Sequence, residues 1–232
     1  KSLGRIMDEV PVVLVVYDLL ELGGDDVRER PLAWRREHIV ELLQDLRVMD
    51  TLIASPAVPA ATWEDVRTAW ATARERCAEG LMLKRLDGSY GVGRRRGGWW
   101  KWKVQPYAVD AVMIYAQAGH GRRASLNTDY TFAVWDGGAL VPFAKAYSGL
   151  TDAEIRELDA WIRKNTVEKF GPVRSVKPEQ VFEIAFEGIQ ASPRHKSGVA
   201  VRFPRIIRWR TDKKPEDADT LAALHGLMHT PR

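Results

Sequence analysis

The apolar positions of the first hundred residues follow a strand-like pattern and then a helical one. The run VPVVLVVYDLL over residues 10–20 predicts a buried strand, because it is rich in β-branched residues and too short for a surface helix. Pro31 opens a segment in which leucine and isoleucine recur at helical spacing. A second helix is predicted from Thr62, whose hydroxyl can cap the first turn while Asp65 reciprocates, and it ends before Gly80.

Two further strands are predicted over residues 81–85 and 99–104, separated by the Gly- and Arg-rich connection DGSYGVGRRRGG. Alternation along WWKWK places two tryptophans on one face and Lys101 and Lys103 on the other. Such a strand offers a rigid pair of cations suited to phosphate, although an exposed edge protected by lysines has the same pattern. Glu79, at the mouth of the first strand, can hold a divalent metal near a phosphate or can simply end the preceding helix.

Beyond Pro106 the pattern changes to short apolar runs separated by turn residues. The runs VDAVMIYAQ, TFAVWDGGALVPFAKA and VFEIAFEGIQ predict strands, and one helix, capped by Thr151 with Glu154 three residues later, interrupts them. The tail from Lys213 onward holds at most one more helix. Several short strands at this spacing are typical of a small barrel or sandwich, and we place its start near residues 105–108.

Composition narrows the class of protein. The net charge is only +4, but the isoelectric point is near 9.2 and arginines cluster, which is typical of a surface that meets polyanions and also of ordinary solvated loops. The single cysteine, Cys77, cannot form an intramolecular disulfide. No secretory signal or 18-residue apolar run is present, so an intracellular protein without a membrane anchor is expected.

Five segments in fixed order resemble the ATP-dependent DNA ligases. They are VYDLLELGG at 16–24, EGLMLK at 79–84, YGVGRR at 90–95, WWKWK at 99–103 and RFPRIIRWRTDK at 202–213. The stretches at 128–150 and 192–221 are similar to the oligonucleotide-binding (OB) domain of bacterial and related cellular ligases. The resemblance implies an α+β chain: part of an adenylation (nucleotidyltransferase) domain over 1–106, with ATP-grasp-like antiparallel sheets and helices, and then a small OB-fold β-barrel over 107–232.

The resemblance also implies roles for individual residues. Tyr17 would stack on adenine, although a core tyrosine at the end of a buried strand is the alternative. Glu79 would bind Mg²⁺, and Lys101 and Lys103 would contact the nucleotide phosphate and help to expel pyrophosphate. The other implied ATP-site residues are the basic positions Lys84 and Arg95 and, in the C-terminal motif that reaches the pyrophosphate, Arg202, Arg210, Asp212 and Lys213.

The same resemblance implies DNA binding by two basic loops of the barrel. Gly119–Arg123 contributes Arg122 and Arg123, and Ser192–Lys196 contributes Arg194 and Lys196. Cations on turns suit phosphates better than bases, so binding would depend on DNA structure and on salt, unless these loops are merely solvated. The barrel would turn toward the nucleotide and then toward DNA, as in the family. Two histidines near the terminus, His225 and His229, favour a mobile tail over a zinc site.

The activity implied is the sealing of 5′-phosphate/3′-hydroxyl nicks in duplex DNA, with ATP and Mg²⁺, through lysine-AMP and DNA-adenylate intermediates. A monomer serving DNA replication, repair and recombination in the bacterial cytoplasm, near the nucleoid, is expected. The family's nucleophile is the lysine of a KxDG motif, which these residues lack; the LDG at 86–88 does not supply it, and the family's second acidic motif is also absent. We therefore expect a truncated chain that cannot adenylate itself.

Two other functions stay open. An RNA ligase or an mRNA-capping guanylyltransferase would share the metal-binding glutamate and the paired lysines, although the RFPR-to-DK ending favours a DNA ligase. A non-catalytic DNA-binding OB module attached to part of a catalytic domain is an alternative of a different class. Binding of nicked DNA without ligation would distinguish that module from an active enzyme.

Overall fold

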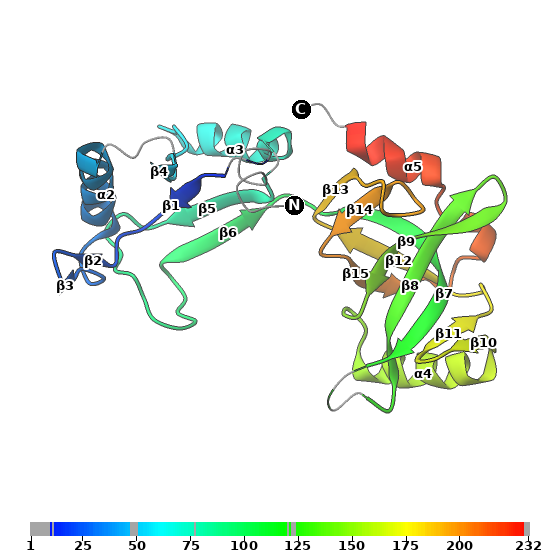
Figure 1. Cartoon of the computed structure of the whole chain (residues 1–232). Helices are drawn as coiled ribbons and strands as arrows, with labels where there is room; N and C mark the ends of the chain where they lie inside the picture. The colour runs from blue at the N-terminus through cyan, green and yellow to red at the C-terminus, as the bar shows by residue number, and fades with distance from the viewer. Residues whose placement is uncertain are drawn as a thin grey trace. The chain divides into compact units, whose positions relative to one another are not determined.

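A computed structural model describes residues 10, 12–46, 51–76, 78–119, 121 and 124–229 of the 232-residue chain. The chain divides into two compact units, Lys1–Val104 and Gln105–Arg232 (Figure 1). The boundary expected between residues 106 and 107 lies close to this division. Each unit has its own sheets and helices and is described separately.

The described residues of the first unit form three small two-stranded sheets and two α-helices. Its elements are β1 (Leu14–Val16), β2 (Glu21–Leu22), β3 (Asp25–Asp26), α2 (Leu32–Leu46), β4 (Leu52–Ala54), α3 (Trp63–Ala71), the 3₁₀ turn η1 (Ala73–Arg76), β5 (Gly80–Lys84) and β6 (Trp99–Lys103). β1 pairs with β4 in parallel, whereas β2–β3 and β5–β6 are antiparallel hairpins. The predicted strands over 81–85 and 99–104 are confirmed as β5 and β6.

Both helices of this unit start where the sequence predicts. α2 begins one residue after Pro31 and buries Leu32, Ile39 and Leu43 on one stripe. α3 carries the predicted capping box, in which the Thr62 hydroxyl accepts from the Asp65 amide and the Asp65 carboxylate accepts from the Thr62 amide. The two helix starts are therefore fixed by local chemistry.

The expectation of a buried strand over residues 10–20 is wrong for the described residues. Only Leu14–Val16 is a strand, and its side chains are largely open: Leu14 is 63% exposed and Val12, just before it, 76%. Parallel strands are normally covered on both faces. β1 pairs only with β4, and within the described part of the chain these two short strands do not bury its valines.

The second unit is built on a curled antiparallel sheet of seven strands. They are β7 (Tyr107–Ala118), β8 (Asn127–Asp136), β9 (Ala139–Ala146), β10 (Thr166–Phe170), β11 (Val173–Val176), β12 (Val181–Phe186) and β15 (Arg205–Trp209). The hydrogen-bonded order is β10-β11-β7-β12-β15, with β8 on the long strand β7 and β9 on β8. A separate hairpin is formed by β13 (Gly188–Ala191) and β14 (Val199–Arg202).

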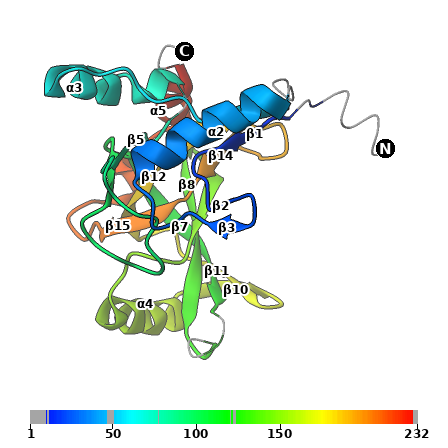
Figure 2. The same ribbon diagram turned by 90° about the vertical axis from the view of Figure 1, so that its left-hand side faces the viewer.

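Helices close the core of this unit. α4 (Asp152–Lys164) starts with the predicted Thr151–Glu154 capping box and packs Ile155, Leu158 and Ile162 inward, across one end of the sheet (Figures 1 and 2). The tail forms η3 (Pro215–Asp217), α5 (Leu221–Gly226) and η4 (Leu227–His229). Because Leu224 of α5 is fully buried, the described tail is packed against the sheet, and the expectation of a mobile tail is wrong.

Candidate nucleotide and phosphate site

The β5–β6 hairpin decides which side chains of WWKWK share a face. Lys103 lies opposite Gly80, Lys101 opposite Met82 and Trp99 opposite Lys84. Directly opposed residues point to the same side of an antiparallel pair, so both lysines lie on the face that also carries Lys84. Trp102, on the other face, stacks on Trp70 of α3 with ring centroids 5.4 Å apart. The predicted separation of tryptophans and lysines is confirmed.

Glu79 and Lys103 form an ion pair at the start of this hairpin. The Lys103 Nζ to Glu79 Oε2 distance is 3.1 Å, and the side chains are 46% and 30% exposed. Gly80 makes the pair possible, because a Cβ atom there would lie 2.2 Å from the Trp102 carbonyl oxygen, and its φ of +135° is one that glycine alone adopts easily. The backbone therefore requires glycine at position 80, and the glutamate before it supplies the ion pair with Lys103.

Lys101 is the exposed cation next to this ion pair. It lies two residues before Lys103 on the same face, roughly 7 Å along the strand. Among the described residues it makes no ion pair. The structure thus brings Glu79, Lys101 and Lys103 to one side of one hairpin.

Tyr17 follows β1 and is 51% exposed, so the alternative of a core tyrosine is excluded. The Lys84 ammonium lies 4.7 Å from the centre of the Tyr17 ring and 3.9 Å from that of Trp99. Burial among these rings lowers the pKa of Lys84. Lys84 is therefore held between aromatic rings, whereas Arg95 is an exposed residue of the β5–β6 connection.

A buried ion pair that the sequence analysis missed lies directly beside Tyr17. The side chains of Arg35 and Asp18 are 0% and 2% exposed, and Arg35 Nε donates to Asp18 Oδ1 at 2.6 Å. Arg35 Nη1 also donates to the carbonyls of Arg30 and, at 3.2 Å, Gly88. The available signal was an arginine inside the apolar stripe of a predicted helix, because such a residue needs a buried acidic partner.

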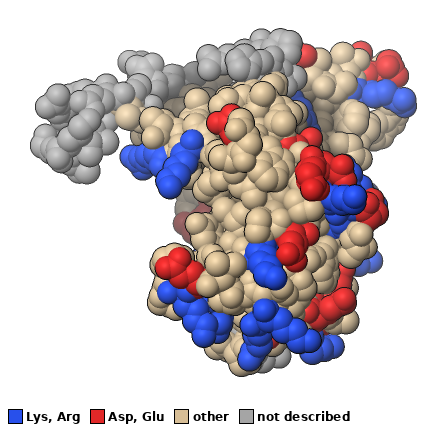
Figure 3. Space-filling model, turned by 90° about the vertical axis from the view of Figure 1, so that its right-hand side faces the viewer, with Lys and Arg blue, Asp and Glu red and all other residues tan. Residues whose placement is uncertain are grey.

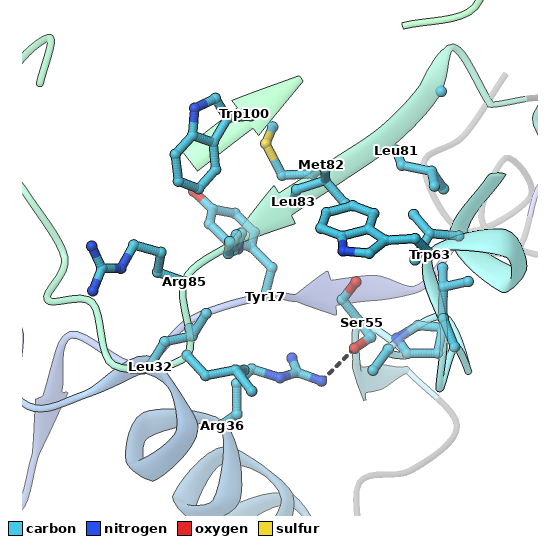
Figure 4. Close-up of a pocket in the computed structure, with 18 of the residues that line it drawn as sticks. Tyr17, Leu32, Arg36, Ser55, Trp63, Leu81, Met82, Leu83, Arg85 and Trp100 are labelled. Carbon is cyan, nitrogen blue, oxygen red and sulfur yellow. Dashed lines mark hydrogen bonds between the residues drawn. The ribbon is translucent and has the colours of Figure 1, made fainter. Parts of the chain in front are cut away.

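A mostly apolar cavity of about 1100 Å³ opens in the first unit. Tyr17, Met82 and Trp100 line it together with Trp63, and Arg36 closes one side by donating to the Ser55 carbonyl at 2.6 Å (Figure 4). A space of this size, with aromatic walls and a few polar groups, accommodates a ligand as large as a nucleotide.

The predicted C-terminal motif forms an ion-pair cluster within the second unit. Arg210 donates to both Asp212 oxygens, at 2.8 and 2.7 Å, and to both Asp110 oxygens at 3.1 Å, while Lys213 Nζ lies 2.6 Å from Asp110 Oδ2. The hydrogen bonds from Arg210 hold the pKa of Asp212 well below its usual range. Asp110 was missed, although a lone aspartate in the apolar run VDAVMIYAQ was a signal. Arg202 is exposed, with its guanidinium 4.9 Å from the Phe203 ring centre.

The cations of only one of the two predicted DNA-binding loops lie among the described residues. Arg122 and Arg123 lie outside the described residues. Arg194 and Lys196 are exposed on a turn closed by the Ser192 amide, which donates to the Gly198 carbonyl at 2.7 Å, and they make no ion pair within the described ranges. Elsewhere on this unit, Lys and Arg gather toward the end that carries α4, with acidic residues between them (Figure 3).

Comparisons with known proteins follow the same division of the chain. Residues 1–103 match the family model described as ATP dependent DNA ligase domain, and residues 123–213 match the ATP dependent DNA ligase C terminal region. A probable DNA ligase of Koribacter versatilis is 39% identical over 95% of this chain and 43% of its own length, and a DNA ligase of Methanoculleus marisnigri is 35% identical over 94% and 39%. A solved structure titled "Pmar-Lig_Pre" aligns with a TM-score of 0.62 and 19% identity, over 86% of this chain and 44% of its own.

Fold and comparisons together define the class of protein. The chain is α+β, with a nucleotidyltransferase unit of helices and small sheets followed by a small OB-fold unit, as the sequence predicts. The expectation of antiparallel sheets in the first unit is wrong for β1 and β4, which pair in parallel. It belongs to the ATP-dependent DNA ligase family. The chain spans less than half the length of these curated relatives. Among the described residues, no helix is long and apolar enough to cross a membrane.

Proposed function

We propose that the full protein is an ATP-dependent DNA ligase that seals 5′-phosphate/3′-hydroxyl nicks in duplex DNA through lysine-AMP and DNA-adenylate intermediates. Membership of the ligase family supports the reaction class. The observation that carries the proposal is the cationic face of the β5–β6 hairpin, where the Glu79–Lys103 pair lies beside the exposed Lys101. This chain supplies that face and the OB-fold unit.

In this proposal the hairpin lysines serve every step. Each step transfers a phosphoryl-type group, so the chemistry depends on positioning and on cations placed where negative charge develops. Lys101 and Lys103 provide two such cations on a strand, which holds them rigidly. Tyr17 stacks on the adenine and directs the α-phosphate of ATP toward them.

The residues present fit a magnesium ion bound mainly through substrate. No group of three His, Cys, Asp or Glu side chains that could hold a metal occurs in the described part of the chain. Mg²⁺ in nucleotide sites commonly takes only one or two carboxylates and completes its shell with phosphate oxygens and water. Glu79 is such a carboxylate, and Mg²⁺ bound there would neutralise phosphate charge.

The OB-fold unit would contribute its C-terminal motif and its basic loops. Arg202, Arg210, Asp212 and Lys213 would meet the pyrophosphate of ATP, and the unit would then turn to hold DNA, as a hypothesis taken from the family. Arg122→Ala with Arg123→Ala should weaken binding to nicked duplex and flatten its salt dependence. An unchanged slope of log affinity against log salt concentration would show that Gly119–Arg123 does not contact DNA.

This chain alone should not adenylate itself, because none of its residues forms a KxDG motif and the covalent carrier must be that lysine. Incubation with α-labelled ATP and Mg²⁺ should leave the chain unlabelled. A stable labelled band would show that another side chain accepts AMP and that this part of the proposal is wrong.

The central test is nick sealing by the full-length protein. Lys101→Ala and Lys103→Ala should each lower kcat by about 100-fold or more, the size of effect seen when one group that stabilises transition-state charge is removed. Arg67→Ala is the matched control, because it removes an exposed cation of α3 whose ion pair among the described residues is with Glu64 of the same helix. Full activity in either lysine variant would refute the role of the hairpin.

A second candidate, a DNA-holding module without ligase activity, is favoured by one observation. Arg194 and Lys196 stand exposed on a turn with its own backbone hydrogen bonds, and exposed cations of this kind suit phosphate contacts. Binding of nicked DNA by the full-length protein with no ligation under any ATP and Mg²⁺ condition would support this function instead.

For the ligase, we propose a monomer in the bacterial cytoplasm, near the nucleoid, that acts in DNA replication, repair and recombination.

A further inference from the structure

Two aromatic rings contact the Lys84 ammonium, and a third ring packs against one of them. Lys84 and Trp99 are cross-strand partners in the β5–β6 hairpin, and the ammonium lies 3.9 Å from the indole centre. Tyr17 contributes a second ring at 4.7 Å. Tyr90 meets Trp99 edge to face, with ring centroids 5.5 Å apart. One cation thus joins residues from three separate segments of the first unit.

The ammonium is in direct contact with ring faces rather than with carboxylates. Its distance to the indole centre is close to van der Waals contact, where the attraction between a cation and an aromatic quadrupole is strongest. Within the described residues Lys84 makes no ion pair. A lysine that is occupied in this way is poorly placed to bind phosphate at the same time, which sets it apart from Lys101 on the same face of the hairpin.

Tyr17 remains available for a ligand although Lys84 contacts it. Tyr17 is 51% exposed and lines the cavity of about 1100 Å³, together with Met82 of β5 (Figure 4). Trp99 meets it at 78°, with centroids 6.2 Å apart, so the indole supports the tyrosine from the side without stacking on it. The contacts fix the orientation of the ring and leave part of its surface for a nucleobase.

We propose that Lys84 is a positioning residue for the nucleobase platform: together with Trp99 it forms a cage that holds the Tyr17 ring, and it acts on ATP through that ring, not through the phosphates. This inference rests on the proposed function, because it needs Tyr17 to bind adenine. It assigns Lys84 a role different from the direct nucleotide contact expected for its basic position in EGLMLK.

Adenosine and ATP separate the two roles, because only ATP carries phosphates. In the full-length protein, Lys84→Met keeps the length of the side chain and removes its charge. This change should lower the affinities for adenosine and for ATP by the same factor, about 2- to 30-fold, the range expected for one cation–π contact. Lys84→Arg, which preserves the cation on the rings, should restore both affinities. The control Lys101→Met should weaken ATP and leave adenosine unchanged.

The outcomes are distinct. Loss of ATP affinity with normal adenosine affinity in Lys84→Met would make Lys84 a phosphate ligand and overturn the inference, as would no change with either ligand. If the wild-type protein bound neither probe, the proposed function itself would fail. A double-mutant cycle with Tyr17→Leu guards against a general folding defect: the effect of Lys84→Met on adenosine should vanish when Tyr17 is absent, and a persisting effect would contradict action through that ring.

Discussion

Replacing Gly80 with alanine tests how the hairpin brings Glu79 to Lys103. The new Cβ atom would lie 2.2 Å from the Trp102 carbonyl oxygen and 2.7 Å from the Lys103 Cα atom, both backbone atoms that cannot rotate away. The φ of +135° adds strain for any L-residue other than glycine. Strained backbone costs about 1–3 kcal/mol and overpacking about as much again, so Gly80→Ala should destabilise the first unit by roughly 2–6 kcal/mol.

The expected structural response is that β5 separates from β6 at its first pair, which removes Glu79 from Lys103. Denaturant unfolding followed by tryptophan fluorescence measures the free energy of unfolding, and the affinity for ATP reports whether the site is intact. Gly98→Ala is the matched control, because a Cβ at Gly98, just before β6, would meet nothing within 4 Å. A Gly80→Ala protein within about 0.5 kcal/mol of wild type, the scale of ordinary surface changes, would refute the close-approach argument.

Three further results are expected. Asp18→Ala leaves the Arg35 guanidinium buried without its partner, so the first unit should lose about 3–5 kcal/mol of unfolding free energy, and an unaltered denaturation midpoint would contradict the ion pair. Arg194→Ala and Lys196→Ala should each reduce the slope of log affinity for nicked DNA against log salt by about 1, if each binds one phosphate; equal slopes would exclude this turn from the interface. Burial raises the pKa of Asp159, but hydrogen bonds from the Asn127 amides and an Arg163 ion pair outweigh it and hold that pKa below its usual value. The ionised Asp159 therefore stabilises the second unit above its unfolded-state pKa, and this stabilisation is lost as pH falls through the folded-state pKa. Between about pH 6 and about pH 2, the unfolding free energy of the wild type should fall more steeply with decreasing pH than that of Asp159→Asn.

Local patterns in the sequence identify the elements that position the site. The two capping boxes and the alternation of WWKWK depend on neighbouring residues only, and each is found where it is predicted. Glu79 and Lys103 are 24 positions apart, but the hairpin makes them neighbours, and a strand pairing across one connection is a local event. Hairpin and capping chemistry could therefore be predicted from the sequence alone.

Interactions between distant segments could not be predicted in this way. Nothing in the pattern around Asp18 indicates that Arg35 is its partner, because that pair depends on how α2 packs against the end of β1. The apolar run over 10–20 shows a preference for burial, but it does not say what covers it, and β1 remains exposed on the described chain. The cage around Lys84 likewise joins segments that are 67 positions apart, from Tyr17 to Lys84.

Asp110 gives the C-terminal motif of the second unit an anion of its own. Its carboxylate already accepts from Arg210 and from Lys213, so an incoming phosphate that engaged these cations would have to displace it. Association would then be an exchange of one anion for another, and its net strength would be the difference between two similar attractions. Under the proposed ligase function, such a motif would bind pyrophosphate transiently rather than tightly, as a group that releases its ligand in every turnover requires.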